Sequence, residues 1–220
     1  MVGMRNHTRN KKQRLVQFLY LLSLIFLGIG LFSLGWAHWP TPIDGVQLII
    51  PAGGLAAAPG EHEFISLSEY ALNVSWSRRV RRGESGILEL RLTDVDAAST
   101  ADAGATQIVL AEPVFFMLQV DPSGETRSAL GDGQTLTLNW RVSGDQRGEF
   151  AGKLYVSFAF FEPTENALVS APVAVVDLDI QVIELWGLSS AMVTWLGVIN
   201  LVLWGAVFVL GRGIEVGMNL

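Results

Sequence analysis

The sequence predicts a mainly β protein with two transmembrane α-helices, in which an immunoglobulin-like antiparallel β-sandwich lies between an N-terminal and a C-terminal membrane helix. Two long apolar runs, at residues 15–37 and 186–210, bracket the chain. Between them, apolar and polar residues alternate with the period of two that places one face of a β-strand in a core. Half of the 220 residues are hydrophobic, which is at the apolar limit for a soluble domain of this size.

Each apolar run is long enough to cross a membrane as a helix. At about 1.5 Å rise per residue, residues 15–37 and 186–210 both exceed the ~30 Å hydrocarbon core of a bilayer. The tail at residues 1–14 carries five Lys and Arg and no acidic residue, and this bias keeps the tail in the cytoplasm. Two crossings return residues 211–220 to the cytoplasm, so we expect residues 38–185 on the extracytoplasmic side.

The first apolar run has a second interpretation, which is a cleaved secretory signal. Gly35 and Ala37 place small residues where a signal peptidase site needs them. The run is longer than the roughly 7 to 15 apolar residues of a signal peptide, and its length favours an uncleaved anchor. The lysine-poor composition, rich in Ala, Gly and Arg, indicates a bacterial protein. The predicted location is therefore the bacterial cytoplasmic (plasma) membrane.

Alternating runs predict a β-sandwich at residues 66–185. Five runs bring apolar side chains to one face: Tyr70, Leu72, Val74 and Trp76; Leu88, Leu90 and Leu92; Leu136, Leu138, Trp140 and Val142; Leu154, Val156, Phe158 and Phe160; and Val176, Leu178, Ile180 and Val182. Two packed antiparallel sheets are the simplest fold that buries such faces. The Gly/Ala/Pro-rich residues 38–65 are expected to form an irregular linker before the sandwich.

Turn motifs separate these runs. Clusters of Gly, Pro, Asp and Ser fall at residues 82–84, 121–124, 131–133, 143–145 and 162–164. The run at residues 107–120 contains Pro113, so the sequence predicts either one strand that is broken or bulged there, or two short strands. About seven or eight strands are expected in the sandwich.

The sequence offers no catalytic, cofactor-binding or metal-binding motif, so we expect neither an enzyme nor a cofactor. Residues 61–63, Glu-His-Glu, are possible metal ligands, but neighbouring residues of a strand point to opposite faces. Residues 94–96, Asp-Val-Asp, begin like a calcium loop and lack its later ligands and its glycine. Residues 83–87 resemble a nucleophile elbow, with Ile87 where glycine is needed. No small-molecule substrate is inferred.

The second apolar run carries small and polar residues along one helical face. These are Ser190, Thr194, Gly197 and Gly205, with Asn200 beside them. Small residues let two helix backbones approach, and a buried Asn amide can hydrogen-bond across a helix interface. The first run has a less regular small surface, at Ser23, Gly28, Gly30 and Gly35. The two runs either pack only on each other or dock into a larger membrane assembly.

Four arginines crowd residues 78–82: Arg78, Arg79, Arg81 and Arg82. Residues 38–185 otherwise form an acidic segment, with nine Lys and Arg against twenty Asp and Glu, a net charge of −11. Nucleic-acid binding is not expected in such a field. Strand alternation predicts that Arg79 and Arg81 share one face. The arginines then protect a strand edge, contact anionic lipid headgroups or dock an acidic partner subunit.

Taken together, these features favour a non-catalytic accessory or scaffold subunit of a bacterial membrane protein complex. Its extracytoplasmic β-sandwich would contact other integral membrane subunits, and its two helices would lie in the lipid bilayer. The alternative is a free-standing, membrane-anchored surface module that binds an extracellular ligand or senses the envelope. Stable association with defined membrane subunits distinguishes the first function from the second.

Overall fold

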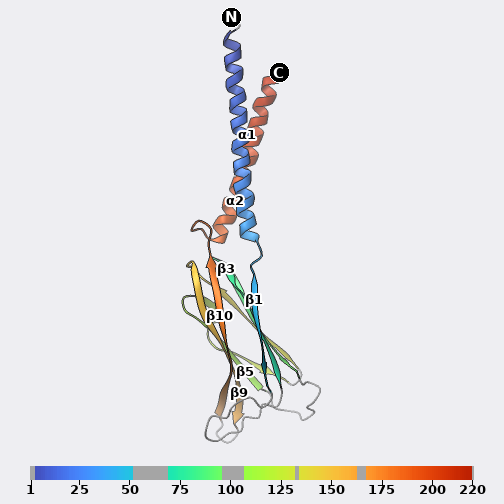
Figure 1. Cartoon of the computed structure of the whole chain (residues 1–220), viewed down its shortest axis with the longest axis vertical. Helices are drawn as coiled ribbons and strands as arrows, with labels where there is room; N and C mark the ends of the chain where they lie inside the picture. The colour runs from blue at the N-terminus through green and yellow to red at the C-terminus, as the bar shows by residue number, and fades with distance from the viewer. Residues whose placement is uncertain (1–2, 52–68, 96–106, 132–133, 163–166, 220) are drawn as a thin grey trace. The chain divides into compact units, whose positions relative to one another are not determined.

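The chain forms two compact units, one helical and one built of strands. The helical unit consists of residues 1–40 and 185–220, and the strand unit of residues 41–184. The computed structural model, drawn in Figure 1, describes residues 3–51, 69–95, 107–131, 134–162 and 167–219.

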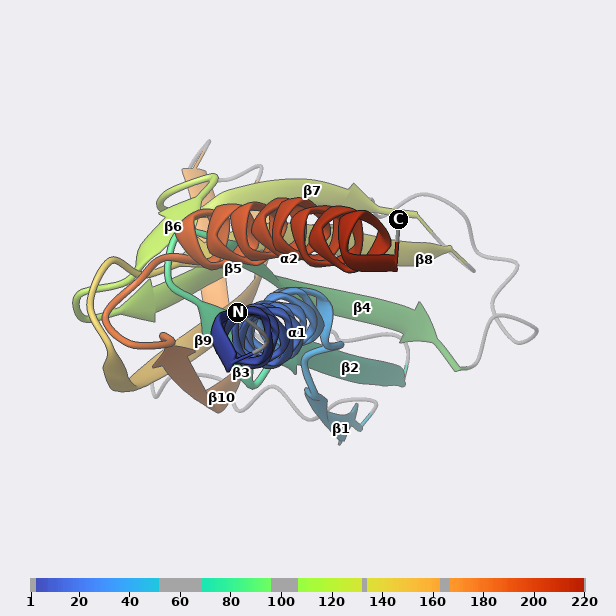
Figure 2. The ribbon, with the colours of Figure 1, turned by 90° about the horizontal axis from the view of Figure 1, so that it is seen from above.

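Two long antiparallel helices make up the helical unit. Helix α1 spans Gly3–His38 and helix α2 spans Ser190–Asn219. Figures 1 and 2 show the two helices side by side. Their apolar parts, Gln13–His38 and Ser190–Val216, are long and apolar enough to cross a membrane. The helical unit is therefore compatible with a two-pass membrane protein.

The second helix begins later than its apolar pattern predicts. The pattern places the start at Trp186, but α2 begins at Ser190 and continues to Asn219, beyond the predicted residue 210. Trp186 and Gly187 have positive φ angles of 54° and 74°, a left-handed conformation that a right-handed helix does not contain. The Trp186 ring instead lies 6.2 Å from the ring of Phe32 on α1. Hydropathy alone does not reveal such a turn.

One sheet of the strand unit has five antiparallel strands in the order β1-β2-β4-β8-β6. Its strands are Ile43–Ile50 for β1, Tyr70–Ser77 for β2, Ser85–Asp94 for β4, Gln119–Asp121 for β6 and Thr135–Ser143 for β8.

The other sheet has five strands in the order β3-β10-β9-β5-β7. The strand β3 is parallel to β10, and the remaining neighbours are antiparallel. Its strands are Arg79–Arg81 for β3, Gln107–Phe115 for β5, Thr126–Leu130 for β7, Gly148–Glu162 for β9 and Ala167–Ile183 for β10.

The core lies between the two sheets and contains the alternating faces that the sequence predicts. The predicted residues of β2, β4 and β10 are all buried, as are those of β8 from Leu138 onward and those of β9 as far as Phe158. Leu136 packs against the core from its margin, and the side chain of Phe160 lies outside the described part of the chain. Trp140 is 1% exposed, and its indole N–H donates to Thr126 Oγ1 at 3.1 Å. Burying a large apolar side chain contributes about 1.5–3 kcal/mol.

The strand order confirms the predicted fold class. In an immunoglobulin-type sandwich, the first, second, fifth and fourth strands share one sheet, and the third, sixth and seventh share the other. Strands β2, β4, β8 and β6 correspond to the first group, and β5, β9 and β10 to the second. The chain is therefore a mainly β sandwich flanked in sequence by two long apolar helices.

Part of the predicted linker is a strand. Residues 43–50, expected to be irregular, form β1 and pair along their whole length with β2. The sequence hides this strand because its burial follows no strict alternation: Asp44 and Leu48 are half-buried, and the residues between them are exposed. Ile50 is the one fully buried residue of β1, and Leu48 packs against the core from its margin. The rest of the predicted linker from residue 52 onward lies outside the described residues.

The run that contains Pro113 forms two strands, and the break is not at the proline. β5 continues through Pro113, which pairs with Leu154 of β9, and ends at Phe115. The run then resumes as β6 in the other sheet. The pairing of β5 with β7 ends at Ala111, so Pro113 lies where β5 has only one described neighbour. Proline is tolerated at such an edge because it lacks a backbone donor.

Candidate functional site

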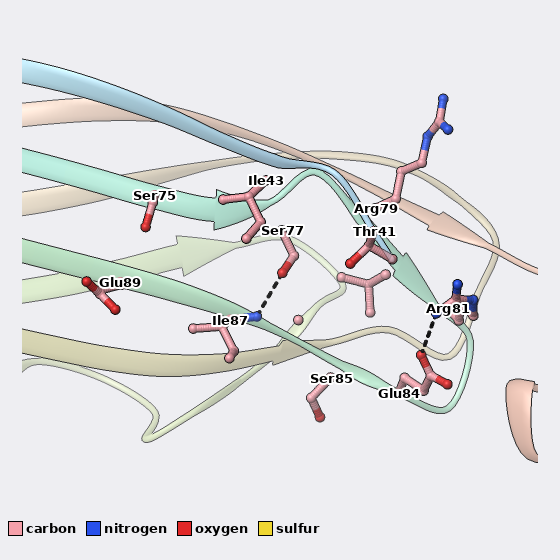
Figure 3. A pocket seen from close by; sticks show the side chains of 12 residues that line it. Thr41, Ile43, Ser75, Ser77, Arg79, Arg81, Glu84, Ser85, Ile87 and Glu89 are labelled. Atoms are coloured by element: carbon pink, nitrogen blue, oxygen red, sulfur yellow. Dashed lines mark hydrogen bonds and ion pairs between the residues drawn. The ribbon is translucent and has the colours of Figure 1, made fainter. Parts of the chain in front are cut away.

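The arginine segment, residues 78–82, carries the chain from one sheet to the other. It follows β2 and includes β3, where Arg79 pairs with Gln181 and Arg81 with Ile183 of β10. After β3 the chain reverses at Gly83, whose φ of 82° suits a residue without a side chain. The backbone N–H of Glu84 donates to Arg81 O at 2.9 Å and closes this turn. Figure 3 shows the turn beside the strands β2 and β4.

All four arginine side chains contact acceptors within the strand unit. Three of the acceptors are carboxylates and one is an amide oxygen. The contacts join Arg78 Nε to Asp44 Oδ2 at 3.6 Å, Arg79 Nε to Gln181 Oε1 at 3.2 Å, Arg81 Nη1 to Glu84 Oε2 at 3.3 Å, and Arg82 Nη1 to Glu184 Oε2 at 3.2 Å. The positive charge of the segment is therefore largely offset locally, which weakens its field at the surface.

Arg79 and Arg81 flank the core residue Val80 in β3, as strand alternation predicts, but the two arginines differ in exposure. Arg79 is exposed, whereas Val80 and Arg81 are only 2% and 7% exposed. Strand alternation assumes that a strand has one wet face and one buried face along its length. The three residues of β3 lie where the chain passes between the sheets, so Val80 enters the core while Arg81 is covered at the turn beside Glu84.

The same segment fastens the two places where the chain enters and leaves the sandwich. The chain enters at Thr41 and leaves at Glu184. The backbone N–H of Arg78 donates to Pro42 O at 3.0 Å, and Arg78 O accepts from Gln181 N at 2.8 Å. On the exit side, Arg82 N donates to Ile183 O at 2.9 Å. We name this end of the sandwich, with residues 41–44, 78–84 and 181–184, the attached end.

A groove of about 380 Å³ opens beside the arginine segment, on the outer face of β1, β2 and β4. The exposed side chains of Ile43 and Ile87 line it together with hydroxyls such as those of Ser75 and Ser77 (Figure 3). The Ser77 hydroxyl accepts a hydrogen bond from Ile87 N at 3.0 Å. Gly86 is required here, since a Cβ would lie 2.6 Å from Val80 Cγ2. The groove offers apolar contact and hydroxyl groups to a ligand.

The other predicted site lies at the crossing of the two helices, and Gly197 is at its centre. A Cβ on Gly197 would lie 2.7 Å from Leu34 Cγ, and a Cβ on Gly30 would lie 3.0 Å from Leu201 Cγ. The two backbones also meet closely there, because a Cβ on Gly197 would lie 3.2 Å from the backbone oxygen of Gly30. Glycines at both positions let α1 and α2 approach closely.

The remaining predicted residues of the α2 face differ in burial and in their contacts. Ser190 and Asn200 are buried, and the Asn200 side-chain amide donates to Leu196 O of its own helix at 2.8 Å. The Thr194 hydroxyl donates to Ser190 O at 3.0 Å. Gly205 lies away from the crossing, since a Cβ there would meet nothing within 4 Å. The small face of α2 is therefore largely occupied by α1.

Sequence reasoning did not find the partners of these residues. Asp44, Gln181 and Glu184 are distant from the arginines in sequence, and only the pairing of β3 with β10 brings the last two close to them. On α1, the crossing uses Gly30 and Leu34. Gly30 belongs to the small surface seen in the sequence, but nothing in that surface distinguishes it from Gly28 and Gly35, which have open space around them.

The described residues contain no group of three His, Asp or Glu side chains placed to hold a metal ion. Residues 61–63, and the last residue of the Asp-Val-Asp motif, lie outside the described part of the chain. The turn expected at residues 82–84 is present. The turns expected at 131–133 and 162–164 fall mostly on residues that the structure does not describe.

Comparisons with known proteins yield fold-level likeness only. No family model matches the chain, and no curated protein matches it. Among solved structures, a CARDB domain from Pyrococcus furiosus, in complex with di-metal ions, is 14% identical, with 50% of this chain and 84% of that chain covered at a TM-score of 0.31. A PapD-like domain of human CEP192 is also 14% identical, with 49% and 82% covered at a TM-score of 0.31. The fold class rests on the strand order of the chain itself.

Proposed function

We propose that this chain is a non-catalytic accessory or scaffold subunit of a bacterial membrane protein complex. In this proposal both helices cross the cytoplasmic membrane, residues 1–14 and the end of α2 lie in the cytoplasm, and the sandwich lies outside it. The five Lys and Arg before residue 15, with no acid among them, support this orientation. The proposed partners are other integral membrane subunits.

The observation that carries the proposal is the fastening of both chain connections at the attached end. Residues 78–82 hydrogen-bond to Pro42 on the incoming side and to Ile183 on the outgoing side. A β-sandwich that is joined to two apolar helices at one fastened end resists fraying there, because neither connection can peel away without breaking these bonds. Such a module suits a scaffold that presents its remaining surface to a neighbouring subunit.

A second candidate function is a free-standing surface module, and one observation favours it. The small face of α2, which would be the natural docking face for a foreign helix, packs on α1 through Gly197 and Gly30. The outer faces of the helices carry large apolar side chains such as Trp195 and Val202, which suit lipid as well as protein. In this case the groove at Ile43 and Ile87 would bind an extracellular ligand.

Purification of the tagged full chain in a mild detergent distinguishes these functions. We expect defined membrane proteins to co-purify in fixed ratio and to elute with the chain in size-exclusion chromatography, as identified by mass spectrometry. An unrelated two-pass membrane protein with the same tag, expressed at the same level, is the control for adventitious capture. A monodisperse monomer without such proteins would contradict the subunit role and leave the free-standing module.

A further inference from the structure

An exposed apolar tip, which consists of Phe116 and Met117, lies between β5 and β6. The side chains of these residues are 81% and 56% exposed. The residues on either side are held firmly. Phe115 packs directly over Gly152, where a Cβ would overlap its ring, and Leu118 is buried. The tip is thus the part of a tightly anchored connection that remains in solvent.

The backbone of the tip is held in an unusual conformation. Met117 has a φ of 70°, a left-handed value that is unfavourable for a residue with a Cβ. The conformation is kept because the flanking side chains are packed: a Cβ on Gly144 would lie 2.8 Å from Leu118 Cδ2 and 2.8 Å from Val182 Cγ2. Strain in an exposed apolar turn is more typical of a contact surface than of a solvent loop.

The tip lies next to the attached end of the sandwich. Leu118 meets Val182 across Gly144, and the next residue of β10, Ile183, pairs with Arg81. From this end the chain has three residue steps back to the end of α1 at His38 and six steps on to the start of α2 at Ser190. Fully extended, these connections reach only about 10 Å and 20 Å. If both helices span the membrane, this end cannot be far from its surface.

We propose that Phe116 and Met117 insert into the interfacial region of the lipid bilayer in which the two helices are anchored. The proposal rests on the helices crossing the membrane and not on the role as a subunit. Apolar side chains at a membrane surface leave water for the boundary between headgroups and acyl chains, and the gain grows with the apolar area buried. An insertion at this point adds a third attachment to the two covalent ones.

The contact is apolar in origin and does not need anionic lipid. The arginines at the attached end have acceptors within the sandwich, among them Asp44, Glu84 and Glu184. Their attraction to anionic headgroups is therefore reduced. The tip, by contrast, has no charged side chain of its own. A tip that a protein partner covers would also be exposed in the isolated chain. Quenching by lipid and by an aqueous quencher distinguishes a tip in the bilayer from a tip that awaits a protein partner.

The natural absence of cysteine permits single-site labelling of the full chain. The variant Phe116→Cys places an environment-sensitive fluorophore at the tip, and Gln119→Cys places it on exposed β6 next to an intact tip. Val95→Cys is the matched control, since Val95 is also apolar and exposed. It follows Asp94 at the far end of β4, nine residues from Ser85, which comes directly after the attached end.

Each labelled chain is reconstituted in nanodiscs of phosphatidylcholine with and without nitroxide-labelled phosphatidylcholine. We expect blue-shifted emission and strong quenching by the nitroxide lipid at positions 116 and 119, and no lipid quenching but full quenching by aqueous iodide at position 95. Equal iodide quenching at all three positions, without lipid quenching, would overturn the proposal and assign the tip to water or to a protein partner. Lipid quenching that requires added phosphatidylglycerol would also overturn it, because the contact would then be electrostatic.

Discussion

The substitution Arg81→Glu is expected to destabilise the sandwich by about 1–3 kcal/mol, because it leaves a charged group in a buried position without its ion-pair partner. Arg81 is almost fully buried, and its guanidinium contacts the Glu84 carboxylate at 3.3 Å. A glutamate at this position would place its carboxylate beside that of Glu84 at the turn. The guanidinium that now pairs with Glu84 would be gone. The same turn follows β3 and precedes β4, so its loss should loosen the crossing between the sheets.

Urea unfolding of the full chain in detergent, followed by tryptophan fluorescence, measures this effect. Arg79→Glu is the matched control, because it makes the same charge change two residues away in β3, at an exposed side chain whose hydrogen bond among the described residues is to the neutral amide of Gln181. We expect its free energy of unfolding to change by less than about 1 kcal/mol. Equal destabilisation by the two variants would show that Arg81 is not a buried structural residue.

The second large effect is expected from Gly197→Leu at the helix crossing. A side chain there would overlap Leu34, since even a Cβ would lie 2.7 Å from Leu34 Cγ. Overpacking of this kind typically costs about 1–3 kcal/mol, and here it would force α1 and α2 apart. Gly205→Leu is the matched control, because the same side chain added on the same helix meets nothing within 4 Å.

A disulfide across the helix pair reports whether the crossing survives. A Cβ at Gly211 lies 3.7 Å from Leu19 Cβ, which is the separation that a disulfide prefers. The double variant Leu19→Cys and Gly211→Cys should therefore cross-link on mild oxidation, and no native cysteine competes. We expect Gly197→Leu to reduce the cross-linked fraction strongly and Gly205→Leu to leave it unchanged. Undiminished cross-linking with Gly197→Leu would refute the crossing.

The fold was predictable where one face of a strand is buried along its length. Trp140 and the alternating leucines of β4 show this directly, because period-two burial leaves a clear pattern in the sequence. The pattern failed for β1, an outer strand with only one fully buried residue. It also gave no sign that Arg81 is buried, because Arg81 is covered at the turn beside Glu84 and not by the strand period. Local periodicity does not encode such a contact.

The candidate sites were less predictable because they depend on partners far apart in sequence. The small face of α2 was visible, but its partner Gly30 could not be distinguished from the other small residues of α1 until the two helices were placed together. Likewise, the charge of residues 78–82 suggested a docking surface, and the acceptors that offset it come from β1, the turn and the end of β10. Sequence composition shows that the arginines are positively charged. Only the contacts in the folded chain show whether carboxylates of the same chain already offset that charge.

The most direct test of a two-pass membrane module asks on which side of the membrane each unit lies. Single cysteines at Thr137→Cys, exposed on β8, and at Gly213→Cys, exposed near the end of α2 with open space around it, can be labelled without native competition. Spheroplasts are treated with a membrane-impermeant maleimide before and after lysis. The predicted result is labelling of position 137 in intact spheroplasts and of position 213 only after lysis. Labelling of both positions in intact spheroplasts, or of neither, would contradict the account.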